Sequence, residues 1–179
     1  MIGRREVITL LGGAAAWPLM AHAQQSDRVP RVGALIPGSE SGPAQLWRAA
    51  FEQSLRELGW VDGRNVQIDY RWAAGAIDRY RAFAAELIAL RPDVLFAGNT
   101  PALAVLQQAT HAIPIVFALV GDPIGGGFVT KLDRPGGNIT GFMSVEPPLA
   151  GKCVELLREA VTTVNRVAFL YNPDTAPYA

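Results

Sequence analysis

The chain has 179 residues, half of them hydrophobic, and its 16 Lys and Arg residues equal its 16 Asp and Glu residues in number. This length suits about one ordinary domain core, and the balanced charge argues against a nucleic-acid partner. The single cysteine excludes an intrachain disulfide, and the two histidines are too few for a histidine-based metal cluster. We therefore expect neither a metal ion nor a cofactor.

The first 23 residues have the pattern of an export signal. Arg4-Arg5 supply positive charge, Val7–Met20 is an apolar stretch, and Ala21-His22-Ala23 fits a small-x-small cleavage site. The stretch is shorter than the ~20 residues that a membrane span needs, and the paired arginines resemble a twin-arginine signal. We expect cleavage after Ala23 and export to the periplasm, without a lipid anchor because the residue directly after the cleavage site is Gln24 and not a cysteine.

The first half of the mature chain alternates predicted strands and helices. Arg31–Ile36 is an apolar run typical of a strand, and Pro43 opens a helix that Gly59 ends. Val66–Trp72 alternates apolar and polar residues, as a half-buried strand at a sheet edge does, and Ile77–Leu90 has the period of an amphipathic helix. The inner stripe of the first helix is expected to contain Leu46, Trp47, Ala50, Phe51, Ser54, Leu55 and Leu58.

The centre of the chain carries the strongest functional signal. Asp93–Ala97 is a short apolar run, expected as a strand buried on both faces of a parallel sheet. Gly98-Asn99 then turns the chain, Thr100 is expected to cap a helix, and Pro101 to take its first position, where a missing N–H costs nothing. Free backbone N–H groups at such a helix start favour anions and polar ligand groups.

The same arrangement is predicted one strand later. Pro114–Leu119 is a second apolar strand, Gly121 turns the chain, Asp122 can cap, and Pro123 is expected at the first position of another helix. Two strands would thus end in similar helix starts at one edge of the sheet. We place the function at that edge.

The remaining residues predict a loop over Lys131–Asn138, a short strand over Ile139–Phe142 and a helix over Leu149–Val161. Arg166–Tyr171 is expected as a further strand, and Asn172-Pro173-Asp174 as another turn of the cap-plus-proline kind. The faces of the last helix and strand are too apolar to stand in water without a partner layer. We therefore expect the chain to be marginally stable or to self-associate through residues 149–171.

Strands that alternate with helices indicate βαβ units and a doubly wound parallel α/β sheet. Right-handed crossovers favour the strand order 2-1-3-4-5, in which the switch point lies between strands 1 and 3. Ligands bind there, outside the carboxyl ends of the strands. The loops concerned are Pro37–Gly42, Gly98–Pro101 and Gly121–Pro123.

Several short motifs have structural explanations. Gly125–Gly127 lacks the rest of a phosphate-binding motif and is interpreted as a turn or a close backbone approach. Gly38–Gly42 is not a nucleophile elbow, because Glu40 stands where serine belongs. His111 is expected at the surface past a helix end, and Cys153 as a small buried residue. Trp47, Trp60 and Trp72 are interpreted mainly as core residues, with pocket lining as the alternative.

Several segments together resemble ABC-transporter substrate-binding proteins of the type I periplasmic-binding fold, a group that includes aromatic-amino-acid binders. They are RREVITLLGGAAAWPL, ELGWVDGRNVQIDYRWAAG, AGNTPALAVLQQAT, IPIVFALVGDPIGGGFV, LDRPGGNITGF and VAFLYNPDT. The resemblance implies a periplasmic, non-catalytic protein whose two α/β domains close on a small polar or amino-acid-like ligand. It would deliver that ligand to an ABC permease in the inner membrane.

The resemblance also implies a ligand site on the three loops that the predicted topology selects. Carried over position by position, the implied contacts are Pro37, Gly38, Ser39, Asn99, Thr100, Pro101, Val120, Gly121 and Asp122. An amino-acid carboxylate would meet the helix start at Thr100, and Asp122 would suit the ammonium group. The alternative for Thr100 and Asp122 is that they act only as helix caps.

The expected division is an export signal over residues 1–23, an α/β domain over 29–145 and the beginning of a second domain over 146–179. Members of the resembled family are usually about twice as long, so the second domain is expected to be incomplete, either because the chain is a fragment or because the gene product is truncated. An alternative to the binding function is a non-functional truncated fragment of a binding protein.

Two other functions are alternatives to solute binding. A small exported flavodoxin-like hydrolase or transferase would need a nucleophile, a base and an orienting group, which the sequence does not assemble. The sensor core of a transcription regulator would need DNA-binding helices in place of an export signal.

Overall fold

The computed structural model describes residues 28–143, 149–163 and 165–168. Five parallel strands form one sheet in the order β2-β1-β3-β4-β5, which confirms the predicted doubly wound α/β fold and strand order. The predicted export signal, the tail of the last predicted strand and the final turn lie outside the described residues. The elements are β1 (Arg31–Ile36), α3 (Ala44–Glu57), β2 (Gln67–Trp72), α4 (Ile77–Ala89), β3 (Val94–Ala97), α5 (Thr100–Ala109), β4 (Ile115–Val120), β5 (Ile139–Met143) and α6 (Leu149–Ala160).

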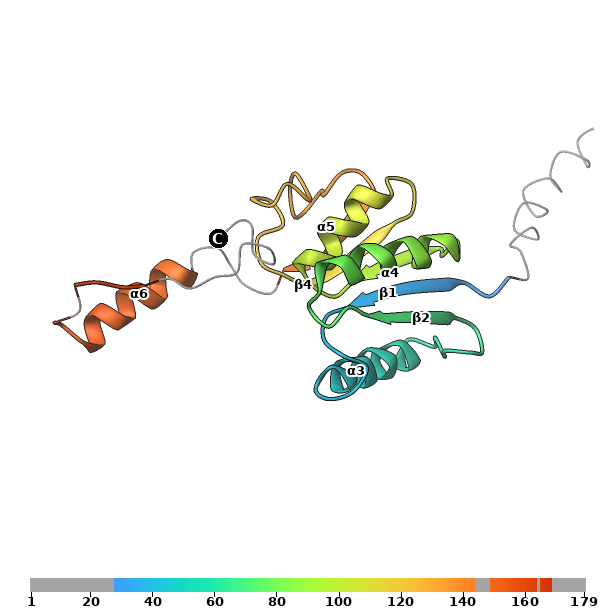
Figure 1. The fold of residues 1–179 in the computed structure, drawn as a ribbon, viewed down its shortest axis with the longest axis horizontal. Coiled ribbons are helices and arrows are strands. Elements are labelled where there is room, and N and C mark those ends of the chain that lie inside the picture. The colour runs from blue at the N-terminus through green and yellow to red at the C-terminus, as the bar shows by residue number, and fades with distance from the viewer. Residues whose placement is uncertain (1–27, 144–148, 164, 169–179) are drawn as a thin grey trace, which may run out of the picture.

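Helices α4 and α5 cover one face of the sheet, whereas α3 lies on the other (Figure 1). The α4/α5 face holds the larger core, in which Leu87, Leu95, Leu103 and Leu106 are all inaccessible to solvent. Tyr80 is also in this core at 1% exposure. Because the inner positions of both helices are apolar at helical spacing, this face closes completely.

The α3 face is less complete. Phe51 and Leu55 of α3 are partly buried against a small core formed by β1, β2 and the residue before β2, Val66. The other five members of the predicted inner stripe are exposed. The large ones among them, Leu46, Trp47 and Leu58, are 72%, 53% and 75% exposed. The prediction that the whole stripe packs inward is therefore wrong, because one edge of α3 extends beyond the sheet surface that it covers.

The predicted helix from Pro123 does not form. The chain instead makes successive turns, in which Asp122 and Pro123 accept hydrogen bonds from Gly126 and Phe128 at 2.9 and 3.0 Å. Gly127 has φ of +70°, a value outside the right-handed helical range. The three-glycine segment is thus a turn with close backbone approach, as predicted, and it prevents a helix from propagating.

Helix α6 confirms the predicted helix to within one residue, but its environment does not match the prediction for Cys153. That cysteine is exposed, as are the other α6 residues whose side chains are described. Arg166–Ala168 have no strand structure, so the described part of the last predicted strand is wrong as well. Both predictions assumed a partner layer that no described residue supplies. No described helix combines the length and apolarity needed to cross a bilayer.

Candidate ligand-binding site

The candidate site lies at the carboxyl ends of β1, β3 and β4, beside the crossover point of the sheet. Strands β1 and β3 are neighbours, although β2 lies between them in sequence and pairs with the outer side of β1. The chain leaves β1 and β3 in opposite directions here, toward α3 on one face and α5 on the other (Figure 1). This is the position at which open α/β sheets bind ligands.

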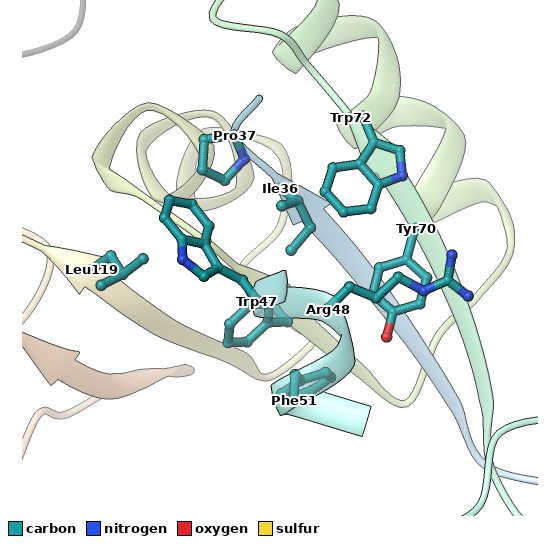
Figure 2. Close-up of a pocket in the computed structure, with 10 residues that line it drawn as sticks. Ile36, Pro37, Trp47, Arg48, Phe51, Tyr70, Trp72 and Leu119 are labelled. Atoms are coloured by element: carbon teal, nitrogen blue, oxygen red, sulfur yellow. The ribbon is translucent and has the colours of Figure 1, made fainter. Parts of the chain in front are cut away.

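A small cavity of about 70 Å³ opens between these strand ends and the first turns of α3. Figure 2 shows its side chains, which come from α3, the edge strand β2 and the ends of β1 and β4. Its surface is almost entirely apolar. The residues that line it are Ile36, Pro37, Trp47, Arg48, Phe51, Tyr70, Trp72, Phe96, Gly98 and Leu119.

Five aromatic side chains give the cavity its chemical character. Phe51 stacks on Phe96 with ring centroids 5.1 Å apart, and Tyr70 stacks on Trp72 at 6.0 Å. Trp47 completes the set. Flat aromatic walls favour an apolar or aromatic group of a ligand, which gains dispersion and ring–ring contacts. The interpretation of Trp47 and Trp60 as core residues is wrong, because they are 53% and 43% exposed. Trp72 packs against the small core, as interpreted, and it lines the cavity together with Trp47.

Arg48 and Tyr70 form one end of the cavity. The Arg48 guanidinium lies 4.6 Å from the Tyr70 ring centroid, a cation–π distance, and its Nε is 2.6 Å from Glu52 Oε1. The Tyr70 hydroxyl is buried, and among the described residues it has no partner with hydrogen-bond geometry, although Glu52 is near. Burial and the charge of Glu52 raise the pKa of Tyr70 above its ordinary value.

The start of α5 lies directly beside the cavity, because Gly98 lines it. The residue that caps α5 is Asn99, not Thr100 as predicted. Asn99 has an extended backbone, and its Oδ1 accepts a hydrogen bond from Ala102 N at 3.0 Å. Its Nδ2 donates to Tyr80 Oη at 2.8 Å. With Asn99 in the capping conformation, Thr100 becomes the first helical residue and its hydroxyl is not needed as a cap.

The polar groups of Thr100 are consequently available to another hydrogen-bond partner. Neither its hydroxyl nor its backbone N–H forms a hydrogen bond within the described ranges. Pro101 has no N–H, while the N–H groups of Ala102 and Leu103 bond to Asn99. The helix start therefore offers one free N–H and one hydroxyl, fewer than the several N–H donors expected from the sequence.

The first predicted loop contributes one residue to the cavity and two to its surroundings. Pro37 lines the cavity and approaches Gly98 so closely that a Cβ at Gly98 would come within 2.8 Å of the proline ring. Gly38 has φ of +86°, which glycine adopts without strain. Ser39 is exposed, and its hydroxyl donates to the Ser41 carbonyl at 2.7 Å.

The third predicted loop lies next to the cavity rather than in it. Val120 is buried and Gly121 half-buried. Asp122 Oδ1 accepts a hydrogen bond from Gly125 N at 2.8 Å, so the carboxylate caps the turn that replaces the predicted helix. No group of three or more His, Cys, Asp and Glu side chains in the described part of the chain could hold a metal ion.

Sequence reasoning missed most of the cavity. Of the nine predicted contacts only Pro37 lines it, and the larger contribution comes from α3 and β2. A signal was present: the α3 stripe and the alternation of β2 bring Phe51, Tyr70 and Trp72 to the same face of the sheet. Three aromatic residues facing one another beside a crossover point would have indicated a pocket.

Comparison with known proteins identifies the family. A model of the family described as ABC transporter substrate binding protein matches residues 41–177. A tyrosine-binding protein of Clostridioides difficile is 28% identical over 128 residues, which cover 70% of this chain and 36% of that protein.

Several solved structures are also similar to this chain in fold and sequence. A conserved domain protein from Vibrio cholerae has a TM-score of 0.72 at 32% identity, covering 83% of this chain and 49% of its own. An ABC domain from Streptococcus pneumoniae in complex with L-Trp has a TM-score of 0.63 at 31% identity, covering 73% and 43%. A ligand-free, open substrate-binding protein with adhesive properties from Clostridium difficile has a TM-score of 0.62 at 29% identity, covering 73% and 43%.

The chain thus spans between about a third and a half of the length of these relatives. The family match extends over most of the chain, and the fold agrees with that of the solved structures. This chain belongs to the ABC transporter substrate-binding protein family.

Proposed function

We propose that this chain is part of the periplasmic solute-binding component of an ABC importer, and that it binds an amino-acid-like ligand with an aromatic or large apolar side chain without catalysing a reaction. The observation that carries the proposal is the aromatic cavity beside the uncommitted polar groups of Thr100. The names of two relatives, one tyrosine-binding and one solved with L-Trp, support the same ligand class.

The proposed binding mode divides the ligand between two regions. Its ring enters the cavity between α3 and the strand ends, while its carboxylate accepts hydrogen bonds from the Thr100 N–H and hydroxyl. The helix dipole adds ~0.3–1 kcal/mol, and a charge-assisted hydrogen bond adds about 1.5–3 kcal/mol. Asp122 keeps its Oδ2 for the ammonium group, since Oδ1 is bonded to Gly125.

The wider assembly is proposed on the family alone. Residues 1–23 act as a cleaved export signal, residues 29–145 form the first domain of a two-domain cleft, and 146–179 begin the second. An ABC permease of the inner membrane receives the ligand. The exposed apolar residues of α6, such as Leu156 at 63% and Leu157 at 50%, support association through residues 149–171 where no second domain covers them.

The test is a titration of the isotope-labelled chain with L-Trp, L-Tyr and L-Glu, followed by nuclear magnetic resonance, which detects weak binding to half a cleft. We expect L-Trp and L-Tyr, but not L-Glu, to shift the signals of Gly98, Thr100 and the Trp47 indole. Thr100→Ala and Asp122→Asn should each weaken binding by roughly tenfold, equivalent to ~1.4 kcal/mol.

Thr140→Ala is the matched control, since Thr140 is an exposed threonine on β5 away from the cavity. It should bind as the parent does. If no amino acid shifts these signals, or if the Thr100 and Asp122 variants lose stability but keep their affinity, the proposed site is wrong.

A further inference from the structure

Two residues of the cavity differ from the others in their exposure. Trp47 is 53% and Leu119 is 50% exposed, whereas every other side chain that lines the cavity is buried or half-buried. In Figure 2 both lie on the side of the cavity away from Tyr70 and Trp72. Trp47 and Leu119 thus form the open rim through which a ligand group would enter.

Leu119 has a backbone conformation that leucine rarely adopts. Its φ is +57°, in the left-handed region, where a side chain with a Cβ meets the carbonyl oxygen of its own peptide. Only two other described residues that are not glycine have positive φ, Ala74 and Arg91. Such strain persists only where the surrounding structure imposes it, and it gathers at functional sites.

A β-bulge in β4 imposes this conformation on Leu119. Phe117 pairs with Gly141 and Val120 with Met143, so β4 advances three residues while β5 advances two. The extra residue lies between Phe117 and Val120. A Cβ at Gly141 would collide with the Phe117 backbone, so the glycine permits the close strand contact beside the bulge. Bulges of this kind re-aim a side chain, here that of Leu119, toward the cavity rim.

We infer that Leu119 is a specificity-determining residue of the proposed site: the bulge holds its strained backbone so that its side chain, with Trp47, limits the size of the ring that enters the cavity. The inference rests on the proposed function, because it assigns the size limit of that same site. The strained conformation has no other evident use, since half of the Leu119 side chain is in solvent and adds little to the core.

Two substitutions separate the side chain from the strain. Leu119→Ala removes the leucine part of the rim but keeps a Cβ in the left-handed conformation, whereas Leu119→Gly removes both the side chain and the strain. Arg91→Gly is the matched control: Arg91 also has positive φ, at +52°, but it follows α4 at the opposite end of the sheet, and its side chain forms no hydrogen bond or ion pair with a described residue.

The measurements are the dissociation constants of L-Trp and L-Phe, from resonance titrations of the full chain, and the melting temperature of each variant. Both Leu119 variants should change the ratio of the two dissociation constants by at least about fivefold in favour of the larger ring, since even one extra or missing methylene in an apolar pocket discriminates by about 10–200-fold. Arg91→Gly should leave the ratio unchanged.

The melting temperature should be about 2–4 °C higher for Leu119→Gly than for Leu119→Ala, and similarly higher for Arg91→Gly than for the parent, because glycine adopts positive φ without strain. A ratio within twofold of the parent in both Leu119 variants would overturn the inference while the proposed function stands. If the parent binds neither amino acid, the proposed function fails, and the inference fails with it.

Discussion

The two faces of the sheet are both covered by helices with apolar residues, but they are packed to different extents. On the α4/α5 face, long aliphatic side chains fill the space to complete burial. On the α3 face, aromatic rings stack in pairs but leave a cavity, and a large part of the α3 stripe stays in solvent. A fully packed face contributes stability, and an incompletely packed one keeps space and apolar surface for a ligand.

The largest expected effect tests the packing difference directly. Leu103→Ala on the closed face should lower the free energy of unfolding by about 2–5 kcal/mol, because Leu103 is fully buried and its loss leaves a cavity. Phe51→Ala on the open face should cost only about 1–2 kcal/mol, although it removes more atoms, since Phe51 is only half-buried. Urea unfolding of the two variants measures both values, and equal losses would contradict the comparison.

A smaller effect concerns one tyrosine hydroxyl on each face. Tyr80→Phe should cost about 1 kcal/mol, since it removes the acceptor of the Asn99 amide. Tyr70→Phe should leave stability unchanged or increase it, because the Tyr70 hydroxyl is buried without a hydrogen bond among the described residues. Urea unfolding at neutral pH measures the free energy of unfolding of both variants. A loss for Tyr70→Phe as large as that for Tyr80→Phe would mean that the Tyr70 hydroxyl has a partner.

The smallest effect appears only in alkali. Burial raises the pKa of both Tyr70 and Tyr80 above the ordinary value of 10.0. A raised pKa means that the unfolded chain releases the proton first, so the stability is intact below about pH 10 and declines as the pH rises above it. Tyr70→Phe should make this decline shallower than in the parent. Unfolding curves at about pH 8, 10 and 11 measure the slope; identical slopes would exclude Tyr70 as a contributor.

Helix starts show where local sequence signals are sufficient and where they are not. At α5 the sequence predicts the helix and its proline, but assigns the cap to Thr100 when Asn99 performs it. Both residue types cap helices, and Asn99 prevails because its amide is also held by Tyr80 of the neighbouring helix. At Pro123 the same signals occur without a helix, because the glycines that follow favour turns.

The sequence by itself determined the strands of the sheet, the principal helices and the parallel order β2-β1-β3-β4-β5, since apolar runs, alternation and proline or glycine boundaries are local features. It also located the edge of the sheet at which the candidate site lies. Only the tertiary structure decided that Trp47 stays half exposed, that aromatic residues of α3 and β2 enclose a cavity, and that a bulge places Leu119 at its rim. These features depend on how far one helix overlaps a sheet and on the pairing of two strands. The left-handed backbone of Leu119 cannot be predicted from the local sequence, because residues from elsewhere in the fold impose that conformation.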